Sequence, residues 1–342
     1  MRLLVTGGYF DDSGECFVDR LDPGRGTRER LLSFVPPAPH RIPGKGFTGA
    51  AWLDADTFLV CSFDAVWRFT PATGRCTGRL HQADFNDLHG LAVDHTAVQL
   101  HICNTGLDSI ETFDLHGRFL GRAAMTPAWF EAARQQGNAV ARDDFDRVLV
   151  AGWQQAPRPA PPLKAPGGDY YDRPGDEPFH RSKVRDYMHP NSVVVWGEHL
   201  VATVLASSEL RCLRTHRTLA RVAAPPHDGL SVGDDLWLTT VDGRIWRIAR
   251  SGDVALVFDT AATGRLGWCR GLAIDVDAIA VGLTAIRTAP KYVWRTECYE
   301  RTETGVLWLD RASGRLRAWV GYDDSSRHAK LFALLPARGA WA

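Results

Sequence analysis

A short pattern recurs through this sequence at intervals of about 40 residues. Each copy opens with a polar residue and a small residue, and three further short apolar segments follow with turn residues between them. The segments HGLAVD (89–94) and RGLAID (270–275) are two clear copies. The copies open at Thr48, His89, Asn191, Asp228 and Arg270. Four short strands in a period of about 40 to 50 residues are typical of one blade of a β-propeller, so the repeat predicts this all-β architecture.

The spacing of the copies and the two chain ends predict how many blades there are. Three of the gaps are 41, 37 and 42 residues long, and the remaining gap is 102 residues long. Residues 1–35 read as three strands, and residues 330–335 (KLFALL) read as a single strand with no followers. If the N- and C-terminal strands pair, they complete one more blade and close the ring, which removes exposed sheet edges. We therefore predict a six-bladed propeller that forms a single domain over residues 1–342.

The long gap leaves a seventh blade open as an alternative. Residues 122–185 contain a predicted helix at 126–136 and a proline-rich stretch at 154–180. Proline cannot occupy central strands, so the second part of this segment does not form a regular blade. One interpretation is a long insertion, helix plus proline-rich loop, that covers the mouth of the central channel, because loops of this length are usually functional or disordered. The other is a degenerate seventh blade that opens at Asn138.

Charge and cysteine content exclude several classes of function. The chain has 40 basic and 40 acidic residues and a formal net charge of zero, so no overall field attracts it to nucleic acid or to an anionic membrane. Its seven cysteines are an odd number without CxxC spacing, which argues against a disulfide framework and a zinc ribbon. The N-terminus lacks the apolar core of a signal peptide, and no apolar run of about 20 residues is present. We expect a cytoplasmic protein that acts on a small molecule, without a nucleic-acid or membrane partner.

Three histidines coincide with the repeat and suggest a metal site. The first residues of the innermost strands meet at one mouth of a propeller's channel. His89, His189 and His227 lie at or within two residues of three such openings, and neutral imidazoles ligate zinc, iron, copper or manganese. With Asn191 as a further ligand, they predict a site for a divalent metal ion such as Zn, Fe, Mn, Cu or Ca. The structural alternative is a capping hydrogen bond for each histidine and an Asx turn for Asn191.

Two charged residues at the same openings are candidates for catalysis. Asp228 could act as a general base, or it could form an Asx turn into its strand. Arg270 could present its guanidinium group to a substrate carboxylate or phosphate, or it could form a salt bridge to Asp87 or Asp228. Cys269 precedes Arg270 and could be a nucleophile or a buried, unreactive thiol.

Several segments carry a resemblance to known proteins. They are LHGLAVD (88–94), HPNSVVVWGEHLVAT (189–203), PPHDGLSVGDDLWL (225–238) and CRGLAIDVDAIAVGL (269–283). These segments resemble an uncharacterised bacterial family of conserved β-propeller proteins, which implies the fold and no particular activity. More distantly, the repeat is similar to the SMP-30 and gluconolactonase-like propellers, whose Glu, Asn and Asp at blade openings hold a divalent metal beneath a sugar lactone. Asn191 and Asp228 occupy such positions here, and Thr48 stands where the glutamate is expected.

These observations support three functional hypotheses. The first is a metal-dependent enzyme that acts on a small polar molecule at the channel mouth, as a lactonase-like hydrolase, a lyase or an isomerase. The second is a non-catalytic propeller that binds a protein or a small ligand, because this architecture serves both purposes. The third is a redox role for copper or iron at the same histidines.

Overall fold

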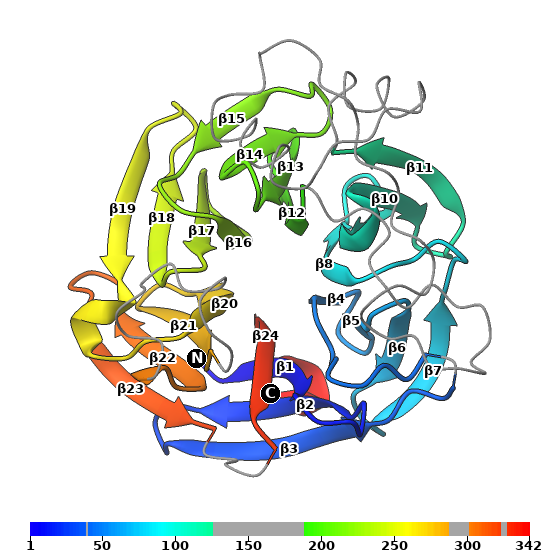
Figure 1. The fold of residues 1–342 in the computed structure, drawn as a ribbon, viewed down its shortest axis with the longest axis horizontal. Helices are drawn as coiled ribbons and strands as arrows, with labels where there is room; N and C mark the ends of the chain where they lie inside the picture. The colour runs from blue at the N-terminus through cyan, green and yellow to red at the C-terminus, as the bar shows by residue number, and fades with distance from the viewer. Residues whose placement is uncertain (39, 126–187, 287–300, 323–326) are drawn as a thin grey trace.

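The fold is a closed ring of six antiparallel sheets, each with four strands (Figure 1). It is seen in a computed structural model that describes residues 1–38, 40–125, 188–286, 301–322 and 327–342. Within these residues the predicted six-bladed propeller is confirmed. None of the helices in the described residues has the length and apolar character that crossing a membrane requires.

The blades are numbered here in chain order, and their strands run from the channel outwards. Blade 1 consists of β24 (Ala329–Pro336), β1 (Leu3–Tyr9), β2 (Cys16–Asp22) and β3 (Thr27–Phe34). Blade 2 consists of β4 (Ala50–Trp52), β5 (Phe58–Cys61), β6 (Val66–Thr70) and β7 (Arg75–Leu80). Blade 3 consists of β8 (Leu88–Asp94), β9 (Gln99–Asn104), β10 (Ser109–Asp114) and β11 (Phe119–Ala124).

The second half of the ring repeats this order. Blade 4 consists of β12 (Pro190–Trp196), β13 (His199–Val204), β14 (Glu209–Cys212) and β15 (Thr218–Arg221). Blade 5 consists of β16 (Pro226–Val232), β17 (Asp235–Thr240), β18 (Arg244–Ile248) and β19 (Val254–Asp259). Blade 6 consists of β20 (Trp268–Ile274), β21 (Ala278–Thr284), β22 (Gly305–Asp310) and β23 (Leu316–Gly321). Three short 3-10 helices complete the described elements: η1 (Thr105–Leu107), η2 (Thr260–Thr263) and η4 (Gly339–Trp341).

The two ends of the chain close the ring as predicted. Strand β24 pairs antiparallel with β1, from Leu3 opposite Pro336 to Tyr9 opposite Ala329. In Figure 1 the red C-terminal strand lies beside the blue N-terminal strand. All seven residues of β1 are buried, which is expected for a strand with neighbours on both sides.

The ring passes directly from blade 3 to blade 4. A methyl group at Gly90 of β8 would come within 2.7 Å of the carbonyl oxygen of Asn191 on β12, so these two inner strands lie against each other. Of the predicted insertion, residues 122–124 belong to β11. The predicted helix at 126–136, the proline-rich stretch and Asn138 lie outside the described residues.

Threonines on second strands fix the start of the inner strand of the following blade. Thr6 on β1 donates to the carbonyl of Thr48 at 2.7 Å, and Thr203 on β13 donates to the carbonyl of His227 at 3.0 Å. Thr284 on β21 does the same for β24. Because such side chains hold backbone groups at the openings of the inner strands, the residues at the mouth are carried on fixed positions.

Candidate functional site

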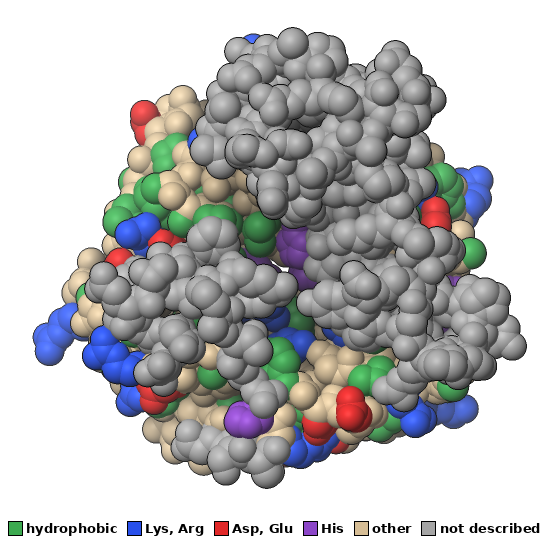
Figure 2. Space-filling model, in the orientation of Figure 1, with side chains coloured by type: hydrophobic (Ala, Val, Ile, Leu, Met, Phe, Trp, Pro, Cys, Tyr) green, Lys and Arg blue, Asp and Glu red, His purple; other side chains and the backbone are tan. Residues whose placement is uncertain are grey.

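The structure brings the three predicted histidines together at the channel mouth. The ring centroids of His89 and His189 lie 5.1 Å apart, and those of His89 and His227 lie 6.2 Å apart. They come from blades 3, 4 and 5, and Figure 2 shows histidine side chains at the centre of this face. His89 and His227 are almost fully buried. The repeat alone therefore located a real cluster of imidazoles.

Hydrogen bonds fix which nitrogen of two of these imidazoles carries the proton. Nδ1 of His227 lies 2.9 Å from Oδ2 of Asp228, and Nδ1 of His89 lies 2.9 Å from the backbone oxygen of Asp87. A carboxylate or a carbonyl accepts, so each Nδ1 donates and the ring's lone pair is on Nε2. Metal-binding histidines usually donate their other N–H to a carboxylate or backbone carbonyl, and both rings have this arrangement.

Asp228 is held in place by contacts to two blades. Its Oδ2 accepts the backbone N–H of Gly271 on β20 at 2.6 Å and lies 3.5 Å from the hydroxyl of Thr239 on β17. The same oxygen accepts Nδ1–H of His227. Asp228 thereby links blades 5 and 6 and orients an imidazole. Its geometry favours a positioning role over the predicted role of a general base.

Asn191 places an amide at the start of β12. Its side chain is 2% exposed, and Nδ2 donates to the backbone oxygen of Pro226 at 3.2 Å. Its Oδ1 is buried and has no hydrogen-bond partner among the described residues. Since buried polar oxygens are almost always partnered, this oxygen is a candidate ligand for a cation or a bound molecule.

Arg270 stands near the histidines against an aromatic ring. Its Cζ lies 4.4 Å from the ring centroid of Phe332 on β24 and 5.7 Å from that of Trp268. The Phe332 ring is in turn edge-on to His89, with centroids 6.3 Å apart. Nζ of Lys330 lies 5.8 Å from the centroid of the same Phe332 ring. The guanidinium of Arg270 is a group of the kind that pairs with a carboxylate or a phosphate.

The remaining residues at the openings have structural roles. Thr48, at the position where a glutamate was expected, donates its hydroxyl to the backbone oxygen of Leu88 at 2.7 Å and so joins blades 2 and 3. Cys269 is fully buried. Burial, with a smaller contribution from the nearby Asp228, raises the pKa of the Cys269 thiol well above its ordinary value. A thiol that stays protonated is a poor nucleophile, which favours the unreactive interpretation.

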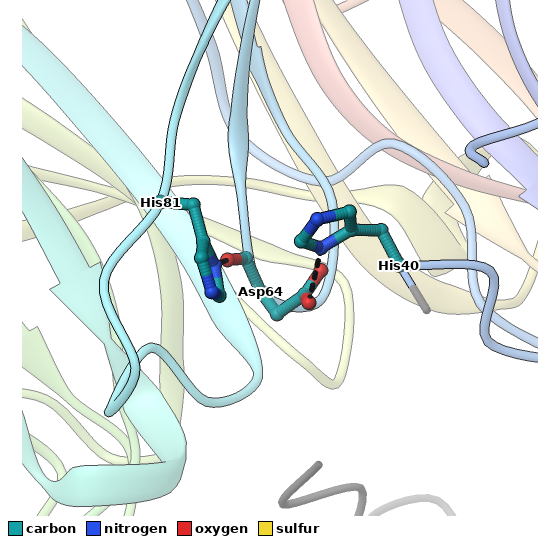
Figure 3. Close-up of side chains that lie close together, drawn as sticks. All are labelled: His40, Asp64 and His81. Carbon is teal, nitrogen blue, oxygen red and sulfur yellow. Dashed lines mark hydrogen bonds and ion pairs between the residues drawn. The ribbon is translucent and has the colours of Figure 1, made fainter. Parts of the chain in front are cut away.

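A second cluster, on blade 2, was missed in the sequence. Among the described residues, His40, Asp64 and His81 form a group whose potential ligand atoms all lie within 4.8 Å of one another (Figure 3). His40 and His81 each stand eight residues before a predicted opening, at Thr48 and His89, so they share a position in the repeat. They were missed because only the residues next to the openings were considered as ligands. A topological signal existed: the connections β3–β4, β5–β6 and β7–β8 must all lie on one face of a propeller, and each carries one of these residues.

Comparisons with known proteins support the fold. Neither a protein-family model nor a curated protein sequence matches the chain, and no sequence-level link to the SMP-30-like propellers was found. A protein of unknown function from Bacteroides caccae is similar in structure, with 9% identity, 97% of each chain covered and a TM-score of 0.61. A chain of a nidogen/laminin complex has 12% identity, covers 98% of this chain and 97% of its own, and has a TM-score of 0.54.

A third solved structure is more distant. It is a catalytically inactive variant of virginiamycin B lyase from Staphylococcus aureus with quinupristin, with 10% identity, 80% of this chain and 75% of that chain covered, and a TM-score of 0.47.

Together, the fold and the site define the class of this protein: a six-bladed β-propeller with an imidazole-rich channel mouth.

Proposed function

We propose that this protein is a metal-dependent enzyme that acts on a small polar molecule at the channel mouth. The proposed metal ligands are the Nε2 atoms of His89 and His227 and an imidazole nitrogen of His189, with Asn191 as a further oxygen ligand. The observation that carries the proposal is the pair of Nδ1 hydrogen bonds, which direct the lone pairs of His89 and His227 to Nε2. Hydrolysis, including lactone opening, and lyase or isomerase steps are the reaction classes that such a site serves.

One pair of the rings has the spacing of a histidine metal site. When a nitrogen ligates a metal at about 2.0–2.1 Å, the ring centroid lies about 3.2 Å from the metal, so two rings at a tetrahedral angle lie about 5 Å apart. His89 and His189 match this value at 5.1 Å. His227, at 6.2 Å from His89, would move inwards by about 1 Å on metal binding.

The residues around the imidazoles have distinct proposed roles. A divalent cation held there would polarise a carbonyl or phosphoryl oxygen of the bound molecule and lower the pKa of a water molecule. Arg270 binds an anionic group of the substrate with its planar guanidinium. Asp228 holds the His227 ring in its tautomer and strengthens it as a ligand.

The test is metal content after reconstitution with Zn, Mn, Fe, Cu and Ca, measured by mass spectrometry of the elements. A variant with His89→Ala and His227→Ala is compared with the unmodified chain. The matched control carries His95→Ala and His116→Ala, which remove two exposed histidines of blade 3. We expect the first variant to lose one equivalent of metal and the control to lose none. Equal metal content in all three proteins would contradict the proposal.

A binding propeller without catalysis is the second candidate. The observation that favours it is the guanidinium of Arg270, which lies over the Phe332 ring next to His89. Such a group suits a small organic anion even without a metal. Metal-free protein whose melting temperature rises with organic acids or phosphate esters, and whose metal content is unaffected by the histidine variants, would support this candidate.

A cytoplasmic location agrees with the six free cysteines of the described residues.

A further inference from the structure

His40, Asp64 and His81, called here the blade-2 triad, lie in three separate connections on the same face of the ring (Figure 3). His40 precedes β4 and is 4% exposed, Asp64 occupies the turn between β5 and β6, and His81 follows β7. Nδ1 of His40 lies 2.6 Å from Oδ2 of Asp64, and Nδ1 of His81 lies 2.8 Å from the backbone oxygen of Asp64. Asp64 is therefore the centre of the cluster.

The protons on both imidazoles can be assigned from their partners. Nη1 of Arg79 lies 2.6 Å from Nε2 of His40, and arginine can only donate, so this Nε2 accepts. His40 is then a neutral ring whose Nδ1–H donates to Asp64. Nδ1 of His81 donates to a backbone oxygen, which puts the lone pair of His81 on Nε2.

Asp64 is an incompletely compensated buried charge. Its side chain is 0% exposed, and its Oδ1 has no hydrogen-bond partner among the described residues. Its Oδ2 is partnered by His40, which the preceding contacts make neutral. A buried carboxylate is costly unless a cation or a metal offsets its charge. One carboxylate oxygen of Asp64 lies within 4.8 Å of a ring nitrogen of each histidine, so a cation there would meet two imidazoles as well.

We propose that the blade-2 triad is a second site for a divalent transition metal of the Zn²⁺ class, separate from the channel mouth. Two imidazoles and one carboxylate are a common set of protein ligands for such ions and leave a position for water. The metal takes Nδ1 of His40 in place of its proton, and a proton is then carried on Nε2. Arg79 must leave Nε2 for this to happen, and its exposed position on β7 allows it to turn into solvent.

Metal binding at the triad would join the connection before blade 2 to the connection after it. The first of these connections also carries Lys45, and the second carries Asp87, which are paired at 2.7 Å. The same connection continues directly into His89 on β8. This proposal goes beyond the channel-mouth function and does not depend on it.

The experiment measures Zn²⁺ and Co²⁺ stoichiometry by equilibrium dialysis of the full chain. The background variant carries His89→Ala and His227→Ala, so that metal at the channel mouth is removed. We expect it to keep one equivalent, and adding His81→Ala should weaken the remaining binding at least tenfold. Adding His95→Ala instead is the matched control and should change nothing. His81 is only half-buried, so its replacement leaves the fold intact, which circular dichroism verifies.

The outcomes separate the two sites. A background variant that binds no metal, or one that binds equally well after His81→Ala, overturns the triad proposal. An unmodified chain that binds one equivalent and loses it through His81→Ala alone supports the triad and removes the channel-mouth proposal. An unmodified chain that binds two equivalents, each lost with its own histidines, supports both.

A second variant tests the competition with Arg79. Because its guanidinium holds Nε2 of His40 and repels a cation, Arg79→Ala should tighten Zn²⁺ binding to the background variant about three- to fivefold. Arg75→Ala removes an exposed arginine from the other end of the same strand and should leave the affinity unchanged. Weaker binding in Arg79→Ala would show that the arginine supports the cluster and would count against a metal there.

Discussion

Replacing Asp228 tests whether its hydrogen bond to Nδ1 of His227, which leaves Nε2 of this ring as the acceptor, matters for metal binding. One oxygen of Asp228 accepts from Nδ1 of His227 at 2.9 Å and from the backbone N–H of Gly271 at 2.6 Å. Asp228→Ala removes the acceptor of both hydrogen bonds, so the His227 ring loses its orientation and its fixed tautomer. Asp228→Asn leaves one oxygen that can accept both hydrogen bonds; it removes the negative charge and replaces the other oxygen with an NH2 donor.

The expected sizes of the two effects differ. Losing the partner that orients a ligating histidine weakens metal binding by about 10- to 100-fold, so Asp228→Ala should fall in this range. Hydrogen bonds to a charged group are stronger than neutral ones by about 1 kcal/mol, so Asp228→Asn should weaken binding about fivefold.

The fold should tolerate both changes. The Asp228 side chain is 22% exposed, so water can partly replace it at Gly271, and the loss of stability in Asp228→Ala is about 1 kcal/mol. With about 2.1 cal/mol/K of unfolding entropy per residue, a chain of this length then loses only about 1–2 °C in melting temperature. The metal-free proteins are the ones to compare, because bound metal itself stabilises the fold.

The assay is competition for Zn²⁺ against a chromophoric chelator, with His40→Ala and His81→Ala present to remove the blade-2 triad. Asp235→Asn is the matched control, because Asp235 lies in the same blade and pairs only loosely with Arg247 at 3.8 Å. The reasoning would be refuted if Asp228→Ala bound Zn²⁺ as tightly as its parent. It would also be refuted if Asp228→Asn were the weaker binder of the two.

Three further predictions concern the stability and reactivity of the ring. Thr203→Val removes a 3.0 Å hydrogen bond within blade 4, from the backbone N–H of Ser192, and a 3.0 Å hydrogen bond to the backbone oxygen of His227 in blade 5. It should lower the free energy of unfolding by about 2–4 kcal/mol in urea titrations, whereas Thr27→Val on an exposed strand should have little effect. Partly exposed Cys76 should be alkylated before Cys269, whose thiol pKa is raised by burial, and mass spectrometry of the native protein would show the reverse order if this is wrong. Backbone and hydroxyl hydrogen bonds from the following turn, together with an arginine, lower the pKa of Asp310 below the ordinary 3.8, so its contribution to stability is present above that pH and is lost as the pH falls through the lowered value. Asp310→Asn should therefore lose less stability on acidification than the unmodified chain, as measured by urea midpoints on either side of pH 3.8.

The fold was predictable because a propeller repeats one pattern of strands. The openings of blades 2 to 6 were found from the residues that begin the inner strands, and the unaccompanied strand at 330–335 indicated how the ring closes. The count of blades was harder. The adjacency of β8 and β12 depends on a close approach at Gly90. The position of a glycine in the sequence does not show which strand it will face. A seventh blade therefore stayed open until the structure placed these strands together.

The two clusters differ in how far the sequence could reveal them. The channel-mouth histidines occupy equivalent places in the repeat, so knowing the fold was enough to bring them together. His40 and His81 also share a position in the repeat, eight residues before an opening. They lie in connections, however, whose paths depend on local contacts such as the donation by Arg79 from the outer strand β7. The periodic pattern encodes strands and does not encode such contacts. A search for titratable residues in all connections of one face would have found the triad.

The variety of residues at the openings is itself an argument for a ligand at the mouth. Equivalent positions in the blades have similar backbone surroundings, and a purely structural requirement would be met by similar side chains at each of them. Thr48 shows what such a requirement looks like, because its hydroxyl only joins two inner strands. The other openings carry an imidazole, an amide, a carboxylate and a guanidinium, at His89, Asn191, Asp228 and Arg270. A nearly symmetric ring that presents a different functional group from each of these blades is suited to an asymmetric small molecule, whose groups differ in charge and hydrogen bonding in the same way.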